Sequence, residues 1–277
     1  MSGTDAVSTS MPPSSAVGFG QEIVNLPRYP VVDLASAAAR DVIAAGRAQL
    51  AQNGLCLFPD FIAPSALSQM CEEARSFYPT AYYEEQADTH DGSGRLEGFA
   101  MPRKSRSAAS AVAYDRIPAL SPLRRLYEWD GLVGLVRALL GVDRLYRTAD
   151  PLISCLLMYY SNGDELGWHF DPNDGVVTLL LQAPGEGGQF EFVPGIRRDN
   201  EDSRAAIARV MDGAREGVLT PPLLPGTLSI FRGTNSLHRV TPVRGPKPRA
   251  ILTLSFDPEP GVMFSAEIRR RYSGRVN

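Results

Sequence analysis

Residues Leu152–Pro172 read LISCLLMYYSNGDELGWHFDP and end in the triplet His169-Phe170-Asp171. An imidazole nitrogen and a carboxylate oxygen two residues apart, at the end of an apolar run typical of a strand, can turn toward one point and hold a divalent metal ion. The third ligand is expected to be another neutral imidazole, and the chain has only three histidines. His238 stands at the start of a second strand-like run, FRGTNSLHRVTPV. Two histidines and one carboxylate, with the other positions open, are the arrangement used for non-haem Fe(II) oxygen chemistry.

A third strand-like run begins at Arg249 and reads RAILTLSF. An arginine fixed on a strand presents a planar fork of donors that suits the carboxylate of a diacid cosubstrate. The hydroxyl of Tyr160 can reach the same carboxylate from the strand before His169. The two-residue period of a strand places Thr253 on the same face as Arg249, where it can point into the pocket.

Each of these residues also has an ordinary structural interpretation. A His-x-Asp pair occurs by chance in proteins without a metal site. Arginines at strand starts are commonly on the surface, and strand tyrosines are commonly in the core. Trp168, next to the first histidine, is either a wall for the substrate or a packing residue.

The combined pattern resembles the iron(II)/2-oxoglutarate-dependent oxygenases. The resemblance spans roughly residues 53–257 and is carried by the Tyr-x-x-Gly step before WHFD, then GEGGQFEF, PGTLSIF, LHRVTPV and the basic residue beyond His238. Within that superfamily the chain is similar to the prolyl-hydroxylase-like branch that includes bacterial free-amino-acid hydroxylases and halogenases. The resemblance implies that His169, Asp171 and His238 bind Fe(II), and that Arg249 and Tyr160 bind the far carboxylate of 2-oxoglutarate.

Two positions depart from that branch. Its halogenases have a small residue, usually glycine, where this chain has Asp171, and the vacated position accepts chloride. The carboxylate at position 171 therefore implies a hydroxylase. Ile251 stands where some members of the family have a serine that contacts the cosubstrate.

The composition is that of an ordinary globular protein, with 44% hydrophobic residues, 21% charged residues and a net charge of −3. This charge gives no general attraction to nucleic acid or to an anionic membrane. The sequence has no apolar run of about 18 residues and no secretory signal pattern. Its three scattered cysteines fit a reducing compartment, so a cytoplasmic location is expected.

We expect a flexible N-terminal tail over residues 1–29 and one oxygenase domain over residues 30–277, with a helical part to residue 150 and a jelly-roll core over 151–258. The spacing of apolar residues predicts helices over Asp33–Gln52, Pro64–Phe77 and Ser121–Leu140, with Asp33 as the first N-cap, and a short strand over Gly54–Pro59 between the first two. Residues Thr80–Ser110 turn polar and glycine-rich. They are expected to be either a solvated loop or a lid whose candidate substrate contacts are His90, Arg95, Arg103 and Lys104.

After Pro151 the pattern changes to short strand-like runs separated by glycine and proline. The predicted strands are Leu152–Tyr160, Val176–Gln182, Gln189–Val193, Thr227–Phe231, His238–Val243 and Ala250–Phe256, with an inserted helix over Asp199–Gly217. The fold class is therefore mainly β with flanking α-helices, around a double-stranded β-helix of the jelly-roll, cupin-like kind.

The predicted function is an Fe(II)/2-oxoglutarate-dependent dioxygenase that uses O₂ to hydroxylate a small polar metabolite such as a free amino acid. The alternatives are a peptide or protein hydroxylase of the prolyl type and a non-catalytic, metal-binding jelly-roll module. The candidate substrate contacts are Trp168, Thr253, His90 and Arg103. The expected partner is a small-molecule substrate, with no nucleic acid and no membrane, and a homodimer is left open.

Overall fold

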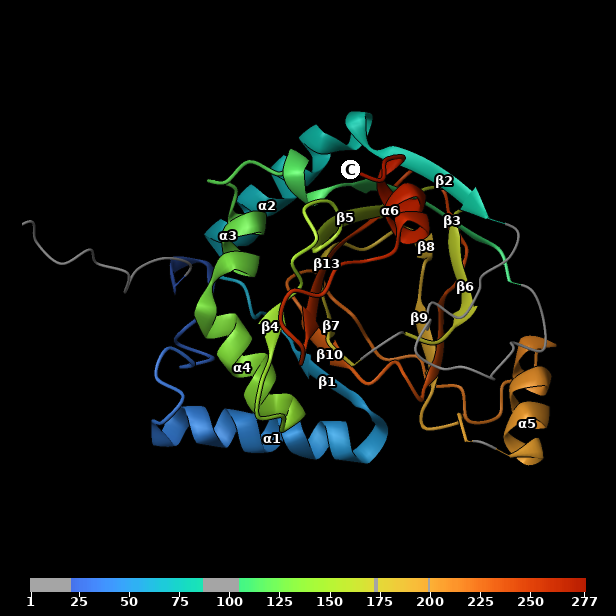
Figure 1. Cartoon of the computed structure of the whole chain (residues 1–277), viewed down its shortest axis with the longest axis horizontal. Helices are drawn as coiled ribbons and strands as arrows, with labels where there is room; N and C mark the ends of the chain where they lie inside the picture. Colours follow the sequence, from blue (N-terminus) through green and yellow to red (C-terminus); the bar gives the residue numbers. More distant parts are fainter. Residues whose placement is uncertain (1–20, 87–104, 172–173, 199) are drawn as a thin grey trace, which may run out of the picture.

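The computed structural model describes residues 21–86, 105–171, 174–198 and 200–277. An eleven-stranded antiparallel sheet curls into a half-barrel, with most of the helices on its outer side (Figure 1). The strands follow one another in the spatial order β1-β10-β7-β13-β5-β3-β6-β11-β9. This architecture confirms the predicted jelly-roll fold class.

Strands from distant parts of the chain alternate across the sheet, as a jelly roll requires. β2 pairs with β3, β4 pairs with β13, and β8 and β12 form a separate two-stranded sheet. The strands are β1 (Leu55–Phe58), β2 (Tyr82–Gln86), β3 (Ser107–Val112), β4 (Tyr146–Arg147), β5 (Cys155–Tyr160), β6 (Glu165–His169), β7 (Val176–Gln182), β8 (Glu186–Gly187), β9 (Phe190–Val193), β10 (Leu228–Phe231), β11 (Leu237–Val240), β12 (Val243–Arg244) and β13 (Arg249–Asp257). Each predicted strand run overlaps one of these strands, and β11 and β13 begin one residue earlier than predicted.

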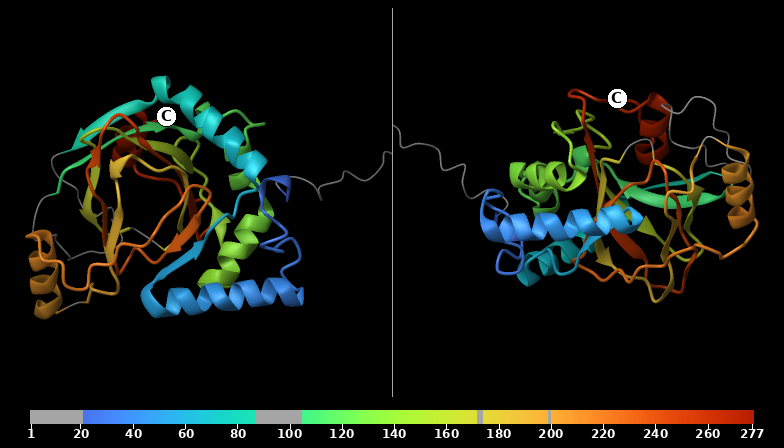
Figure 2. Two further views of the ribbon diagram at one scale, coloured as in Figure 1. Left: turned by 180° about the vertical axis from the view of Figure 1, so that it is seen from behind. Right: turned by 90° about the horizontal axis from the view of Figure 1, so that it is seen from below.

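Four helices cover one side of the sheet, where Figure 2 shows them from two further directions. They are α1 (Ala37–Asn53), α2 (Pro64–Phe77), α3 (Pro122–Glu128) and α4 (Asp130–Leu140). Their apolar sides and the strands β1, β10, β7, β13 and β5 form the largest hydrophobic core. The short 3₁₀ helices are η1 (Gln21–Ile23), η2 (Tyr78–Thr80) and η3 (Tyr114–Arg116). Among the described residues, no helix is both long and apolar enough to cross a membrane.

The helix predictions are correct for type and need two corrections of detail. The N-cap of α1 is Ser36, whose hydroxyl accepts a hydrogen bond from the amide of Ala39, whereas Asp33 accepts one from Ala35 in the preceding turn. The predicted helix over Ser121–Leu140 is two helices. Trp129 has extended backbone angles between them, and its indole ring lies over Gly131, where a Cβ atom would come within 2.1 Å of the ring.

The prediction of a loop or lid over Thr80–Ser110 was wrong at both ends. Strand β2 pairs with β3 along its full length, from Tyr82 opposite Ala111 to Gln86 opposite Ser107. The candidate contacts His90, Arg95, Arg103 and Lys104 lie outside the described residues.

Two helices lie apart from the main helical layer (Figure 1). α5 (Glu201–Met211) confirms the predicted insertion, and it packs through Ile207 and Val210 on Trp168 and Phe170 of the β6 segment. α6 (Ala266–Ser273) was not predicted, and it contacts β2 and β3 near the C-terminus.

Candidate functional site

The two candidate metal-binding histidines are side by side because β6 and β11 are antiparallel neighbours. His169 is the register partner of His238 in this pair, and the centroids of their rings are 4.0 Å apart. Directly opposed residues on adjacent strands project to the same face of a sheet. The strand pairing alone therefore turns both imidazoles toward one point.

Each histidine is held in one tautomer by its own strand. The Nδ1 of His169 is 2.8 Å from the carbonyl oxygen of Gly167, and the Nδ1 of His238 is 2.9 Å from that of Ser236. A carbonyl oxygen only accepts, so both Nδ1 atoms carry the hydrogen and donate it. The Nε2 lone pairs are left facing the site, which is the state a metal ligand needs.

Asp171 follows β6 and completes the group. Its Oδ1 lies 3.4 Å from Nε2 of His238 and 3.8 Å from Nε2 of His169. Its amide donates to the carbonyl of Gly233 at 3.1 Å, which ties the segment after β6 to the turn before β11. A Cβ atom at position 233 would come within 2.0 Å of Oδ2 of Asp171. Glycine is therefore required there to make space for the carboxylate.

The charges of this group favour a cation. Burial and the neighbouring His238 lower the pKa of His169 to about 3, so its imidazole is neutral at pH 7. Burial alone would raise the pKa of Asp171, but His238 and His169 outweigh it and hold that pKa below its usual range. Ligand atoms of the three side chains all lie within 4.8 Å of one another. Two imidazoles and one carboxylate fit Fe(II), with several positions left open for other ligands.

These ligand atoms open into a cavity of about 670 Å³, which the curl of the sheet encloses. One wall is the inner face of β13, where Arg249, Ile251, Thr253 and Ser255 all line the cavity. These four residues, alternate along the strand as the two-residue period requires, share the face that lines the cavity. The ring centroids of Phe190 and Phe231 lie 5.9 and 4.9 Å from the ring centroid of His238, and these rings make its surroundings apolar.

Arg249 is the buried cation of this wall. It is the register partner of Tyr160 across β13 and β5, and its Cζ lies 5.7 Å from the centre of the tyrosine ring. Burial lowers the pKa of the guanidinium from its usual value, and its Nη1 is buried without a hydrogen-bond partner. A buried donor without a partner is costly. A ligand carboxylate in the cavity would satisfy it, and the hydroxyl-bearing Tyr160 lines the same space.

Three of the candidate substrate contacts are not among the described residues that line the cavity. Trp168 does not line the cavity: it packs with Phe170 and α5 on the other face of β6, under the guanidinium of Arg239 at 4.6 Å. The interpretation of Trp168 as a substrate wall is therefore wrong, because neighbouring residues of a strand point to opposite faces. His90 and Arg103 lie outside the described residues.

Sequence reasoning missed the cavity residues that α6 supplies. Glu267, Ile268, Arg271 and Tyr272 line the same cavity as the two histidines. No motif marks this helix. Its only signal is Ser265, which caps it by accepting from the amide of Ile268 and starts a run with a glutamate in the first turn and arginines in the last.

Three solved structures share this architecture. The 2-oxoglutarate-dependent epimerase SnoN from nogalamycin biosynthesis is 16% identical, with a TM-score of 0.55 over 78% of this chain and 83% of that chain. EctD from S. alaskensis, solved with 2-oxoglutarate and 5-hydroxyectoine, is 21% identical, with a TM-score of 0.51 over 77% and 75%. A prolyl hydroxylase from Trichoplax adhaerens, in complex with a peptide of hypoxia inducible factor, is 17% identical, with a TM-score of 0.53 over 84% and 93%.

A comparison with curated proteins gave no match. The model of the family described as Halogenase D matches residues 38–265, which include both paired histidines, Asp171 and Arg249. The matched range is most of the chain, and the shared fold is that of the iron(II)/2-oxoglutarate oxygenases. The chain therefore belongs to the Halogenase D family.

Proposed function

We propose that this protein is an Fe(II)/2-oxoglutarate-dependent dioxygenase that hydroxylates a C–H bond of a small polar metabolite, a free amino acid or a close derivative. The proposal depends on one observation. Three metal-ligand side chains and an arginine with a buried, unpartnered nitrogen face the same cavity. In the proposal His169, Asp171 and His238 hold Fe(II).

Arg249 and Tyr160 are proposed to hold the far carboxylate of 2-oxoglutarate. The planar guanidinium suits bidentate recognition of a carboxylate, and the partner strand places Tyr160 beside it. Bound iron and 2-oxoglutarate supply the oxidation, in which 2-oxoglutarate and O₂ give succinate, CO₂ and a hydroxylated substrate. The protein positions the reactants and excludes water with the apolar rings around His238.

Hydroxylation rather than halogenation rests on Asp171. A carboxylate at this position fills the coordination site that a halide needs, and its negative charge disfavours a second anion there. The lowered pKa of Asp171 keeps it ionised at pH 7. Gly233 leaves space for this carboxylate, so the turn before β11 is shaped for the aspartate.

The size of the cavity favours a small substrate. Its volume of about 670 Å³ falls within the usual range for small-molecule sites, about 300–1,000 Å³. A peptide would need a long extended groove instead. We place the reaction in the cytoplasm, because Cys56, Cys71 and Cys155 are all free and a reducing compartment keeps them so.

The test has two stages. Protein with Fe(II) and 2-oxoglutarate under anaerobic conditions is expected to develop a weak visible charge-transfer band. Succinate production across a panel of amino acids and metabolites then identifies the substrate, and mass spectrometry of the product in chloride buffer and in chloride-free buffer identifies the reaction. A product that gains one oxygen atom from O₂ in both buffers supports hydroxylation. A chlorinated main product overturns it.

A further inference from the structure

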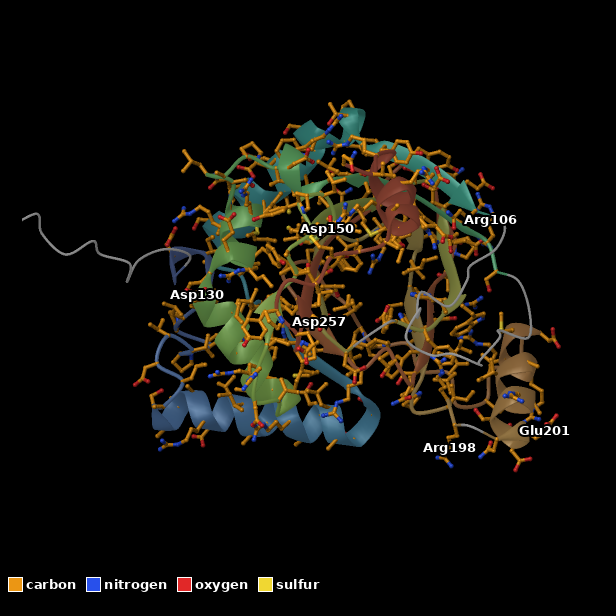
Figure 3. All side chains as sticks on the ribbon, in the orientation of Figure 1. Arg106, Asp130, Asp150, Arg198, Glu201 and Asp257 are labelled. Atoms are coloured by element: carbon orange, nitrogen blue, oxygen red, sulfur yellow. The ribbon has the colours of Figure 1, made fainter. Side chains whose placement is uncertain are left out.

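The C-terminal helix α6 is fixed over the cavity by one ion pair from its middle and another from just beyond its last residue. Arg269 donates to the buried Asp150 at 2.7 Å, and Arg275 forms two hydrogen bonds of 2.7 and 2.8 Å with Asp115. Asp150 also accepts from the amide of Phe264, just before the helix. Asp150 lies close to α6 in Figure 3. These contacts hold the helix at a defined position against β2 and β3.

Arg271 differs from the two arginines that anchor the helix. Among the described residues it has no carboxylate partner, and it lines the cavity that contains the two histidines. Its Cζ lies 5.3 Å from the centre of the neighbouring Tyr272 ring. Arg271 is therefore a second cation that faces the cavity.

Glu267 lies one helical turn before Arg271 and lines the same cavity. Residues four apart on a helix are neighbours on its surface, in the order that favours an ion pair. No ion pair joins these two in the described part of the chain. The helix thus presents an acidic group and a basic group, unpaired and about one turn apart, to one space.

The proposed iron site and its cosubstrate account for only one of the two arginines that line the cavity. The proposed iron site takes Asp171 and one end of 2-oxoglutarate, and the buried Nη1 of Arg249 takes the other end. Arg271 is left for an anionic group of the substrate. We propose that Arg271 binds the carboxylate of an α-amino acid and that Glu267 binds its ammonium group.

This inference rests on the proposed oxygenase function and specifies its substrate class. The two groups of an α-amino acid are separated by one carbon, so neighbouring side chains on one helix face suit them. The remaining lining of the cavity is mostly apolar and includes Ile153, Leu156, Phe190, Leu223 and Phe231. An aliphatic side chain therefore fits the space between the helix and the two histidines better than a charged one.

The first experiment uses the unmodified protein, Fe(II) and 2-oxoglutarate. Succinate formation is measured with each of the twenty protein amino acids, and then with the carboxamide and the N-acetyl derivative of the best one. Losing a hydrogen-bonded charge pair is expected to weaken binding about tenfold to a hundredfold. The carboxamide and the N-acetyl derivative should each need that much higher concentration than the amino acid.

The second experiment compares Arg271→Gln with Arg270→Gln, a matched control on the exposed side of the same helix. Arg271→Gln should raise the amino-acid requirement about tenfold to a hundredfold and bring it close to that of the carboxamide, while the 2-oxoglutarate requirement stays unchanged. Glu267→Gln should likewise remove the preference for the free amine. Arg270→Gln should behave as the unmodified protein.

Three outcomes overturn the proposal. One is that no amino acid raises succinate formation above the slow rate measured without substrate. The slow substrate-free rate would by itself still support the function of the iron and 2-oxoglutarate sites. Another is that the amino acid and its carboxamide are used equally well. The third is that Arg271→Gln raises the 2-oxoglutarate requirement instead, which would place Arg271 at the cosubstrate.

Discussion

The cavity has a strand wall, formed by β6, β11, β13 and their neighbours in the sheet, and a helix wall, formed by α6. The two walls are built in different ways. On the strand wall, His169 and His238 are register partners whose Nδ1 atoms are bound to carbonyls of their own strands. On the helix wall, Glu267 and Arg271 are long side chains with no ion pair among the described residues, and only the helix itself is anchored. Strand pairing fixes atoms that must meet at one point, whereas a helix presents groups that can adjust to a ligand.

The strongest way to break the comparison is to remove one histidine. His238→Ala is expected to abolish iron binding and turnover, because two ligands remain and no other described side chain is grouped with them. The fold should survive, since the largest core lies on the other face of the sheet. Iron content, succinate formation and the thermal unfolding temperature are measured against unmodified protein stripped of metal. Normal 2-oxoglutarate turnover in this variant, or in His169→Ala, would rule out the proposed ligand set.

Arg249→Ala tests the other end of the strand wall. Losing a charge-assisted contact at a buried site costs about 2–5 kcal/mol, so the 2-oxoglutarate requirement should rise by well over tenfold. Arg244→Ala is the control, because Arg244 is an exposed arginine close by on β12. The concentration of 2-oxoglutarate for half-maximal succinate formation is the readout. An unchanged value would move the anchor to another residue, with Arg271 the first to test.

Gly233→Ala tests how tightly the strand wall is packed. The added Cβ would meet the carboxylate of Asp171 at 2.0 Å, so the carboxylate must move and iron affinity should fall about tenfold to a hundredfold. Gly185→Ala is the matched control, because a Cβ there meets nothing within 4 Å. Iron titration compares the two. Equal iron affinities would mean that the turn yields easily, and that the strand wall is no more rigid than the helix wall.

The smallest effect is expected from a substitution of Glu191 of β9, on the outer face of the strand wall, where its carboxylate binds Arg215 and Arg239. Burial alone would raise the pKa of Glu191, but these two arginines outweigh it and hold that pKa below its usual range. The ionised carboxylate therefore favours the folded state above about pH 4.3, the usual value of the unfolded chain, and this contribution is lost as the pH falls below it.

Glu191→Gln should accordingly lower the free energy of unfolding at pH 7 by about 1–3 kcal/mol, with a difference that shrinks between pH 5 and pH 3. Thermal unfolding at a series of pH values measures it. Glu186→Gln, which removes an exposed ion pair with Arg244, serves as the control and should change little. A constant difference across the pH range would show that the amide fails to pack rather than that a charge was lost.

The strand wall could be predicted from the sequence because its chemistry follows the chain. His169 and Asp171 end one strand-like run, and the two-residue period of β13 places Arg249 and Thr253 on one face. The same two-residue period explains why Trp168 is not a cavity residue: its neighbour His169 takes the inner face, so Trp168 takes the outer one.

The helix wall could not be predicted, because what stabilises α6 is distant in sequence. The helix reads AEIRRRYS, with little apolar periodicity, and its anchors Asp150 and Asp115 lie more than 100 residues away. β2 reads YYEEQ without alternation, since among the described strands it lies at an edge and pairs with β3 alone. Tertiary contacts rather than local preference create both elements.

The close approach of Gly233 to Asp171 also limits the order in which this chain can change. While the aspartate is present, any side chain at position 233 collides with it, so position 233 is closed to substitution. Once Asp171 becomes glycine, the space is free and position 233 opens. Gly233→Ser should therefore lower iron affinity in the native background and should have no further effect on it in the Asp171→Gly variant. A change from the carboxylate ligand to an open coordination site would then be easy to reverse at first and hard to reverse after position 233 has been filled.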